Sequence, residues 1–212
     1  MLPQAFWTSL RILVFRSGPE DFPYDVRNRL GIACIAFGIL ANAALAAMMG
    51  QVAVLTKTVT VTPPLWADIV FGLVSVGAMG LFTRVALRAR QLDSRFQQTF
   101  NALLATSSVL ALLMILPIRQ LLPFMPVAQE LSKKLATNPE LANDPAAMSV
   151  FPGWAVLFSL MMPALLTWQF AVTAFIYRRA ANTKAAGGIF IALLCVLTVL
   201  SFRDIFSILL LQ

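Results

Sequence analysis

Two ionisable residues, Arg203 and Asp204, stand side by side inside an apolar stretch that runs from 187 to 212. At about 1.5 Å per residue, this stretch crosses a hydrocarbon core of about 30 Å. The part before the pair, 187–202, covers about 24 Å, which predicts the pair in the outer third of the bilayer. Ionisable groups at that depth cost a few kcal/mol each unless they are paired or face protein or water. The other helices are therefore expected to supply partners.

Residues of opposite charge in two other apolar stretches are the expected partners. Asp68 begins one stretch and Arg119 ends another, both on the side of the membrane that the pair approaches. Because successive residues of a helix point about 100° apart, Arg203 and Asp204 need not satisfy each other. We therefore expect Arg203 to pair with Asp68, and Asp204 with Arg119. Such a network either locks the helix register or forms a polar site for a lipid headgroup, an ion or a proton.

Other polar residues allow two further interpretations. Amides within the apolar stretches either form hydrogen bonds between helices or mark a polar path across the membrane; they are Asn42, Asn101 and Gln169. A dense group of arginines at the end of the second stretch marks the cytoplasmic side, and it also suits contact with anionic lipids. Its members are Arg84, Arg88, Arg90 and Arg95.

The residue types and motifs of most enzymes and metal sites are missing from the sequence. The chain has no histidine, the commonest general base and metal ligand. It contains no Walker loop and no HExxH or GxSxG motif. Its two cysteines, Cys34 and Cys195, lie in apolar stretches and are typical of small hydrophobic residues. We therefore predict a protein that is not an enzyme and that binds neither metal nor cofactor.

The composition predicts a membrane protein. Of 212 residues, 59% are hydrophobic and 12% charged, with a mean hydropathy of +0.82, whereas a soluble domain has about 45–50% apolar and about 25% charged residues. The predicted fold is all-α, a polytopic bundle of five transmembrane helices. These spans lie at about 30–55, 67–87, 96–122, 150–177 and 187–212. Residues 1–29 form a cytoplasmic N-terminal segment with a linker, and residues 30–212 form the membrane domain.

Two shorter helices are predicted outside the five spans. Apolar residues from Phe6 to Val14 recur at three- and four-residue spacing, which is typical of an amphipathic helix. This N-terminal helix lies either at the membrane interface or against the helix bundle. A second amphipathic helix is predicted at 127–136, in the longest loop.

Small residues recur in the first two spans. Ala43 and Ala47 lie four residues apart in the first span, a spacing that permits close helix contact and self-association. Gly72, Gly77 and Gly80 give the second span a thin face. Close packing of both spans is therefore expected.

The net charge of +7 is interpreted as a topology signal. Most of the 16 Lys and Arg residues fall on the side that holds the N-terminus. This bias predicts a cytoplasmic N-terminus and, with five spans, a C-terminus outside. No compact basic run with interleaved aromatic residues is present, so no nucleic-acid partner is expected.

The five spans with their cytoplasmic N-terminal segment resemble the Yip1-domain membrane proteins. The stretch Arg-Phe-Gln-Gln-Thr-Phe-Asn-Ala-Leu at 95–103, running on to Pro117, is similar to the loop-into-helix pattern of the bacterial members. The acidic Tyr-Gly-Pro type motif of the eukaryotic members is not visible here. The resemblance implies a bacterial inner-membrane protein linked to membrane organisation or trafficking partners, and it assigns no catalytic residue.

The predicted function is that of a non-enzymatic integral membrane protein. It organises the membrane or binds lipids, anionic lipids in particular, and membrane-protein partners, which include a second copy of the chain. The alternative is a small transporter, channel or lipid-moving protein that uses the charged site near Arg203 and Asp204. The two hypotheses differ in the need for a polar path across the membrane.

Overall fold

The structure, a computed structural model, describes residues 2–25, 28–57, 64–138, 140 and 151–210, the last three by their backbone only. Within these ranges the chain is helical, with no strand. Five helices are long and apolar enough to cross a membrane, which confirms the all-α prediction with its five long helices. They are α2 (Arg29–Leu55), α3 (Leu65–Arg88), α4 (Phe96–Leu121), α7 (Gly153–Ala180) and α8 (Ala185–Leu210).

Shorter elements connect and flank the long helices. They are α1 (Leu2–Leu13), η1 (Pro19–Asp21), η2 (Asp93–Arg95), η3 (Leu122–Phe124) and α5 (Met125–Thr137). The amphipathic helix predicted in the longest loop corresponds to α5. The predicted ends of the five spans lie within three residues of the observed ones. The end of α7 is one of the larger differences: the helix runs on through Arg178 and Arg179 to Ala180, because charged residues do not stop a helix.

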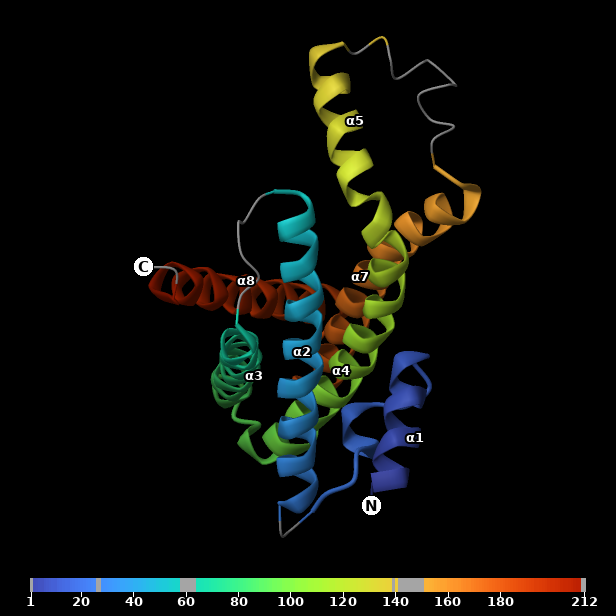
Figure 1. Cartoon of the computed structure of the whole chain (residues 1–212). Helices are drawn as coiled ribbons and strands as arrows, with labels where there is room; N and C mark the ends of the chain where they lie inside the picture. Colours follow the sequence, from blue (N-terminus) through green and yellow to red (C-terminus); the bar gives the residue numbers. More distant parts are fainter. Residues whose placement is uncertain (1, 26–27, 58–63, 139, 141–150, 211–212) are drawn as a thin grey trace.

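The central helix is α4. It packs against α1, α2, α3 and α7, and α8 completes the bundle by packing against α7 and α3. In Figure 1, α4 runs between α2 and α7. Its segment has 72% of its most apolar stretch buried, against 11–44% in the other four. The polar residues in the middle of α4 are therefore internal. Thr106 and Ser108 donate hydrogen bonds to the carbonyl oxygens of Ala102 and Leu104, at 2.7 and 2.6 Å.

The long helices do not share one direction. In Figure 1, α2 stands upright, α4 leans across it, α8 lies across the view, and α3 is seen nearly along its axis. Crossings of this kind need small residues where backbones meet. A Cβ at Gly72 of α3 would lie 2.5 Å from the Ile39 carbonyl oxygen of α2, and one at Gly188 of α8 would lie 2.6 Å from the Ala174 carbonyl oxygen of α7. By contrast, Gly77 faces open space, so only part of the predicted thin face of α3 is used.

The N-terminal helix α1 packs on the bundle. Ala5, Ser9 and Ile12 are buried on the side that meets α4, whereas Trp7 is exposed on the other side. The indole nitrogen of Trp168 in α7 donates to the Leu13 carbonyl oxygen at 3.1 Å. These contacts agree with the second of the two predicted positions, and a location of the exposed side at the membrane interface stays a prediction.

Two glutamines at the start of α4 hold the linker between α1 and α2. Gln97 donates to the Asp25 carbonyl and to the Asn28 side chain, both at 3.1 Å. Gln98 donates to the carbonyls of Glu20 and Phe22, at 3.3 and 3.1 Å. Since η1 lies inside this linker, the four hydrogen bonds fix Glu20 beside the first turn of α4.

Candidate binding sites for anionic groups

The predicted crossed network of charges is not formed. No ion pair joins Arg203, Asp204, Asp68 and Arg119, and the described residues contain a single ion pair elsewhere, between Glu20 and Arg179. Asp68 is buried on α3, whereas Arg119 and Asp204 are exposed. A similar depth in the membrane does not bring side chains together when the helices diverge and present different faces.

One of these four charged residues, Arg203, lines a cavity between the five long helices. Arg203 lines a space of about 280 Å³, to which α2, α3, α4, α7 and α8 each contribute side chains. Asn42 lines the same space, so two of the predicted polar residues do meet. Asn101 and Gln169 are not among its lining residues. Asn101 is only 2% exposed, and its Nδ2 has no hydrogen-bond partner; the structure thus does not join the three amides into one path.

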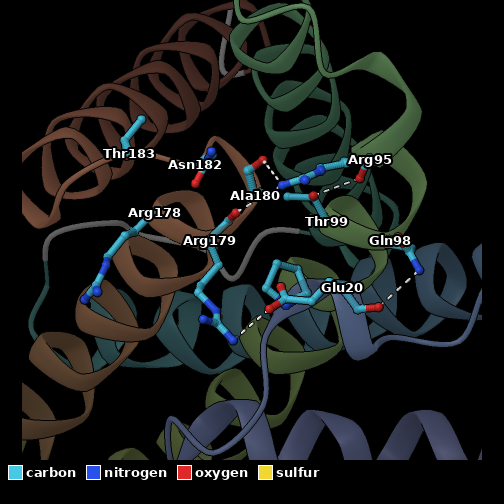
Figure 2. A pocket seen from close by; sticks show the side chains of 10 residues that line it. Glu20, Arg95, Gln98, Thr99, Arg178, Arg179, Ala180, Asn182 and Thr183 are labelled. Atoms are coloured by element: carbon cyan, nitrogen blue, oxygen red, sulfur yellow. Dashed lines mark hydrogen bonds and ion pairs between the residues drawn. The ribbon is translucent and has the colours of Figure 1, made fainter.

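A second, more polar cavity lies where η1, the start of α4 and the end of α7 meet (Figure 2). Its volume is about 400 Å³. Three arginines and one carboxylate line it, and we call it the basic pocket. The charged residues are Glu20, Arg95, Arg178 and Arg179, and the other polar ones are Gln98, Thr99, Asn182 and Thr183.

Two of the three arginines are held by the protein itself. Arg95 donates from Nη1 to the carbonyl oxygens of Arg179 and Ala180, at 3.4 and 3.3 Å. These carbonyls belong to the last turn of α7, which has no further helical partners for them. Arg179 forms the ion pair with Glu20 at 2.8 Å, and its guanidinium lies 6.0 Å from the centre of the Phe175 ring. The walls of the basic pocket are thus fixed.

The third arginine, Arg178, is unpaired. Its guanidinium is exposed and has no ion pair or hydrogen bond in the described part of the chain. The Thr183 hydroxyl is buried and also lacks a partner. The lining of the pocket thus holds three arginines and one carboxylate, of which only Arg179 contacts Glu20, and it has more donors than acceptors. Arginines arranged in this way bind phosphate or carboxylate groups.

The predicted arginine cluster divides between this pocket and open surface. Arg95 lines the basic pocket, whereas Arg84, Arg88 and Arg90 are exposed and do not line it. In the sequence, Arg178 and Arg179 contribute only to the bias of basic residues toward one side of the membrane. The signal available was an adjacent pair of arginines next to a short turn, together with acidic residues in the linker.

A buried group of polar side chains lies next to the basic pocket. Tyr177, fully buried in α7, places its hydroxyl 2.8 Å from the Thr83 hydroxyl of α3 and 3.2 Å from the Cys195 sulfur of α8. Three helices are joined at this point, one residue before Arg178. Both cysteines are unbonded, and no group of three or more potential metal ligands occurs in the described ranges.

Compared with families of known proteins, with curated proteins and with solved structures, the chain matches none. The resemblance to Yip1-domain proteins therefore stays a prediction.

Proposed function

We propose that this protein is a non-enzymatic integral membrane protein that binds the headgroups of anionic phospholipids in its basic pocket. The observation that carries the proposal is the unpaired Arg178 beside two arginines that the protein already holds. Basic pockets between membrane helices on the cytoplasmic side are suited to phosphate-bearing headgroups. Bound lipid then fixes the junction of the N-terminal segment with α4 and α7.

The topology supports this assignment of the pocket. The ends of α3 and α7 and the loops beside them carry most of the basic residues, as the cytoplasmic side of a bacterial inner-membrane protein does. With five spans, the N-terminus is then cytoplasmic and the C-terminus outside. The basic pocket opens at the cytoplasmic headgroup level in this orientation.

Partner binding is a further part of the proposal. Among the described residues, α1 exposes Phe6 and Trp7 and α3 exposes Trp66, which suits contact with lipid or with another membrane protein. Ala43 packs inside the chain against Gly72, so a second copy has to use another face of α2. A role in membrane organisation follows from lipid binding together with such contacts.

Lipid binding to Arg178→Gln tests the proposal, with Arg90→Gln as the matched control. Both variants lose one exposed arginine at the same end of the molecule, but only Arg178 lines the pocket. Native mass spectrometry of the full chain with added phosphatidylglycerol or phosphatidylcholine gives the affinity. We expect phosphatidylglycerol binding to weaken about tenfold in Arg178→Gln, which is about 1.4 kcal/mol, and to change less than twofold in Arg90→Gln.

Equal losses in both variants would show a general charge effect and contradict a specific pocket. Equal binding of phosphatidylglycerol and phosphatidylcholine would contradict headgroup recognition. If a membrane protein co-purifies with the parent in a fixed ratio and is lost from Arg178→Gln, the pocket serves that partner and not lipid.

A further inference from the structure

The cavity around Arg203 is built differently from the basic pocket and lies far from it. Arg203 is near the far end of α8, about 27 Å along the helix from Ala185, which follows the turn that borders the basic pocket. All five long helices contribute side chains to the cavity walls. A space shared by every helix of a bundle is the usual place for a ligand site in such folds.

Arg203 has no acidic partner at this site. Asp204 is exposed and follows Arg203 directly, so its side chain points to another face of α8. Asp68 lies three residues before Phe71 and seven before Ser75, on the side of α3 that lines the cavity. Even so, Asp68 makes no ion pair with Arg203. The positive charge is therefore not neutralised by any described side chain.

The other two polar groups of the cavity each donate a hydrogen bond within their own helix. Asn42 donates from Nδ2 to the Gly38 carbonyl at 2.8 Å, and Ser75 donates to the Phe71 carbonyl at 2.8 Å. Both interactions lie within one helix. Arg203 is the charged group of the cavity and has the most unused donors, whereas Asn42 keeps one amide N–H, so the ligand that complements the site is an anion.

The remaining walls are apolar and adaptable. Met49, Met114 and Met162 come from three different helices, and Leu45 and Leu166 add to the same surface. Methionine side chains adjust to irregular apolar ligands because they are unbranched and flexible. A volume of about 280 Å³ lies just below the range of about 300–1,000 Å³ that is usual for ligand sites, so the cavity holds the acidic end of a lipid and the first part of its chain, not a whole phospholipid.

We propose that this cavity is an intramembrane binding site for an anionic group attached to a hydrocarbon chain, with the anion at Arg203 and the chain against the methionines. Anionic phospholipids and free fatty acids share this chemistry. The proposal is independent of headgroup binding in the basic pocket, because the two sites have no lining residue in common. It gives the molecule two anion sites near opposite ends of α8.

Photo-crosslinking in nanodiscs of phosphatidylcholine tests this site. The probes are palmitic acid, phosphatidylglycerol and phosphatidylcholine, each with a diazirine in the acyl chain. The readout is labelling of peptides that contain Met114 or Met162. We expect an anionic probe to label them, and labelling to fall at least fivefold in Arg203→Gln. The matched control Arg119→Gln, an exposed arginine of α4 outside the cavity, is expected to change labelling less than twofold.

Two further variants separate ligand binding from structure. Arg203→Lys keeps the charge, so it restores most of the labelling if the anion is what Arg203 recognises. Asp68→Asn removes a nearby negative charge and is expected to leave labelling unchanged or raise it. A loss in Asp68→Asn equal to that in Arg203→Gln would mean that Arg203 serves an internal pair, and it would overturn the proposal.

The three probes also distinguish the sources of the ligand. Labelling by phosphatidylglycerol alone assigns an anionic phospholipid, and labelling by palmitic acid alone assigns a fatty acid. Labelling by phosphatidylcholine that does not depend on Arg203 overturns the proposal, because the cavity is then a purely apolar site. Labelling that persists in Arg178→Gln is expected, so a failure of the basic pocket is distinguished from a failure here.

Discussion

The two arginine sites of this protein, the basic pocket and the Arg203 cavity, differ in what the protein itself offers to the charge. In the basic pocket, carbonyl groups and Glu20 hold Arg95 and Arg179 in place. In the cavity, mostly apolar side chains line the space beside Arg203, with Asn42 and Ser75 as the two other polar residues, and no described group accepts a hydrogen bond from Arg203. A polar framework fixes the geometry of a site before the ligand arrives. Where the walls are apolar, the guanidinium of Arg203 has the ligand as its main hydrogen-bonding and ionic partner.

This difference predicts different selectivity at the two sites. The basic pocket positions several donors, so it should distinguish headgroups by shape and by the number of their oxygens. The cavity offers one charge and a flexible apolar wall, so it should accept many acidic amphiphiles. Variants that damage the walls of one site and leave those of the other site intact test this difference in selectivity.

The largest effect is expected from removing the framework of the basic pocket. In Gln97→Ala/Gln98→Ala, four hydrogen bonds between α4 and the linker are lost. At about 0.5–1.5 kcal/mol for each of the four bonds, the free energy of unfolding should fall by about 2–6 kcal/mol. Tryptophan fluorescence during thermal unfolding in detergent measures the change.

The control for this variant is Gln120→Ala, an exposed glutamine at the other end of α4. It should unfold like the parent protein. Limited proteolysis should cut the double variant between residues 18 and 28, while acyl-chain labelling at the Arg203 cavity persists. If labelling at the Arg203 cavity is lost together with stability, the basic pocket and the cavity belong to one cooperative unit. The proposed difference between the two sites would then be wrong.

The second effect concerns the helix crossing near the Arg203 cavity. A methyl group at Gly72 would meet the Ile39 carbonyl at 2.5 Å, whereas one at Gly77 would meet nothing within 4 Å. We expect Gly72→Ala to lower the free energy of unfolding by about 1–3 kcal/mol. Since Ser75 lies one turn further along α3, the cavity wall also moves and labelling falls.

Gly77→Ala is the matched control on the same helix. It should leave the unfolding free energy unchanged or raise it by up to about 1 kcal/mol, because alanine is the better helix former. Phosphatidylglycerol binding at the basic pocket should be the same in both glycine variants. A similar loss of stability in both would show that α2 and α3 do not cross at Gly72.

The third effect concerns the buried junction beside the basic pocket. Tyr177→Phe removes the hydroxyl that contacts Thr83 and Cys195. Because the contact is fully buried, the free energy of unfolding should fall by about 1–2 kcal/mol. Tyr24→Phe, a change at an exposed tyrosine, should have no measurable effect under the same conditions.

The sequence predicts the number and position of the long helices because length and apolar content are local properties. It does not predict their directions or which of them is central. The last apolar stretch contains the ionisable residue Arg203, yet the most buried of the five long helices is α4. Its burial depends on contacts with four other helices, which no single stretch encodes.

The charged sites show the same limit. The sequence predicts that Arg203 pairs with Asp68, but a similar depth in the membrane does not decide which side chains meet, and no ion pair joins the two residues. The pair of Glu20 and Arg179 joins residues far apart in the sequence, through a linker that the glutamines of α4 hold. Local sequence patterns identify ionisable residues whose burial in the membrane costs free energy, whereas the fold determines which side chains they contact.

The smallest effect is expected from the carboxylate of the basic pocket. The side chains of Glu20 and Arg179 are 47% and 49% exposed, so their ion pair contributes less than about 1 kcal/mol to the free energy of unfolding. In Glu20→Gln the fold should therefore be retained. Arg179 becomes available to the ligand, and phosphatidylglycerol affinity should rise by about two- to threefold, with a steeper dependence on salt.

Asp93→Asn removes an exposed carboxylate near the same end of the molecule and outside the basic pocket. If it strengthens binding as much as Glu20→Gln does, the gain comes from net charge and not from the release of Arg179. Labelling at the Arg203 cavity should not respond to either change, because the two sites are separated by most of the length of α8. A response of labelling at the cavity would show that the two sites are coupled through α7 and α8. The arginines held by polar groups in the basic pocket and Arg203 in its apolar cavity would then be two ends of one ligand path.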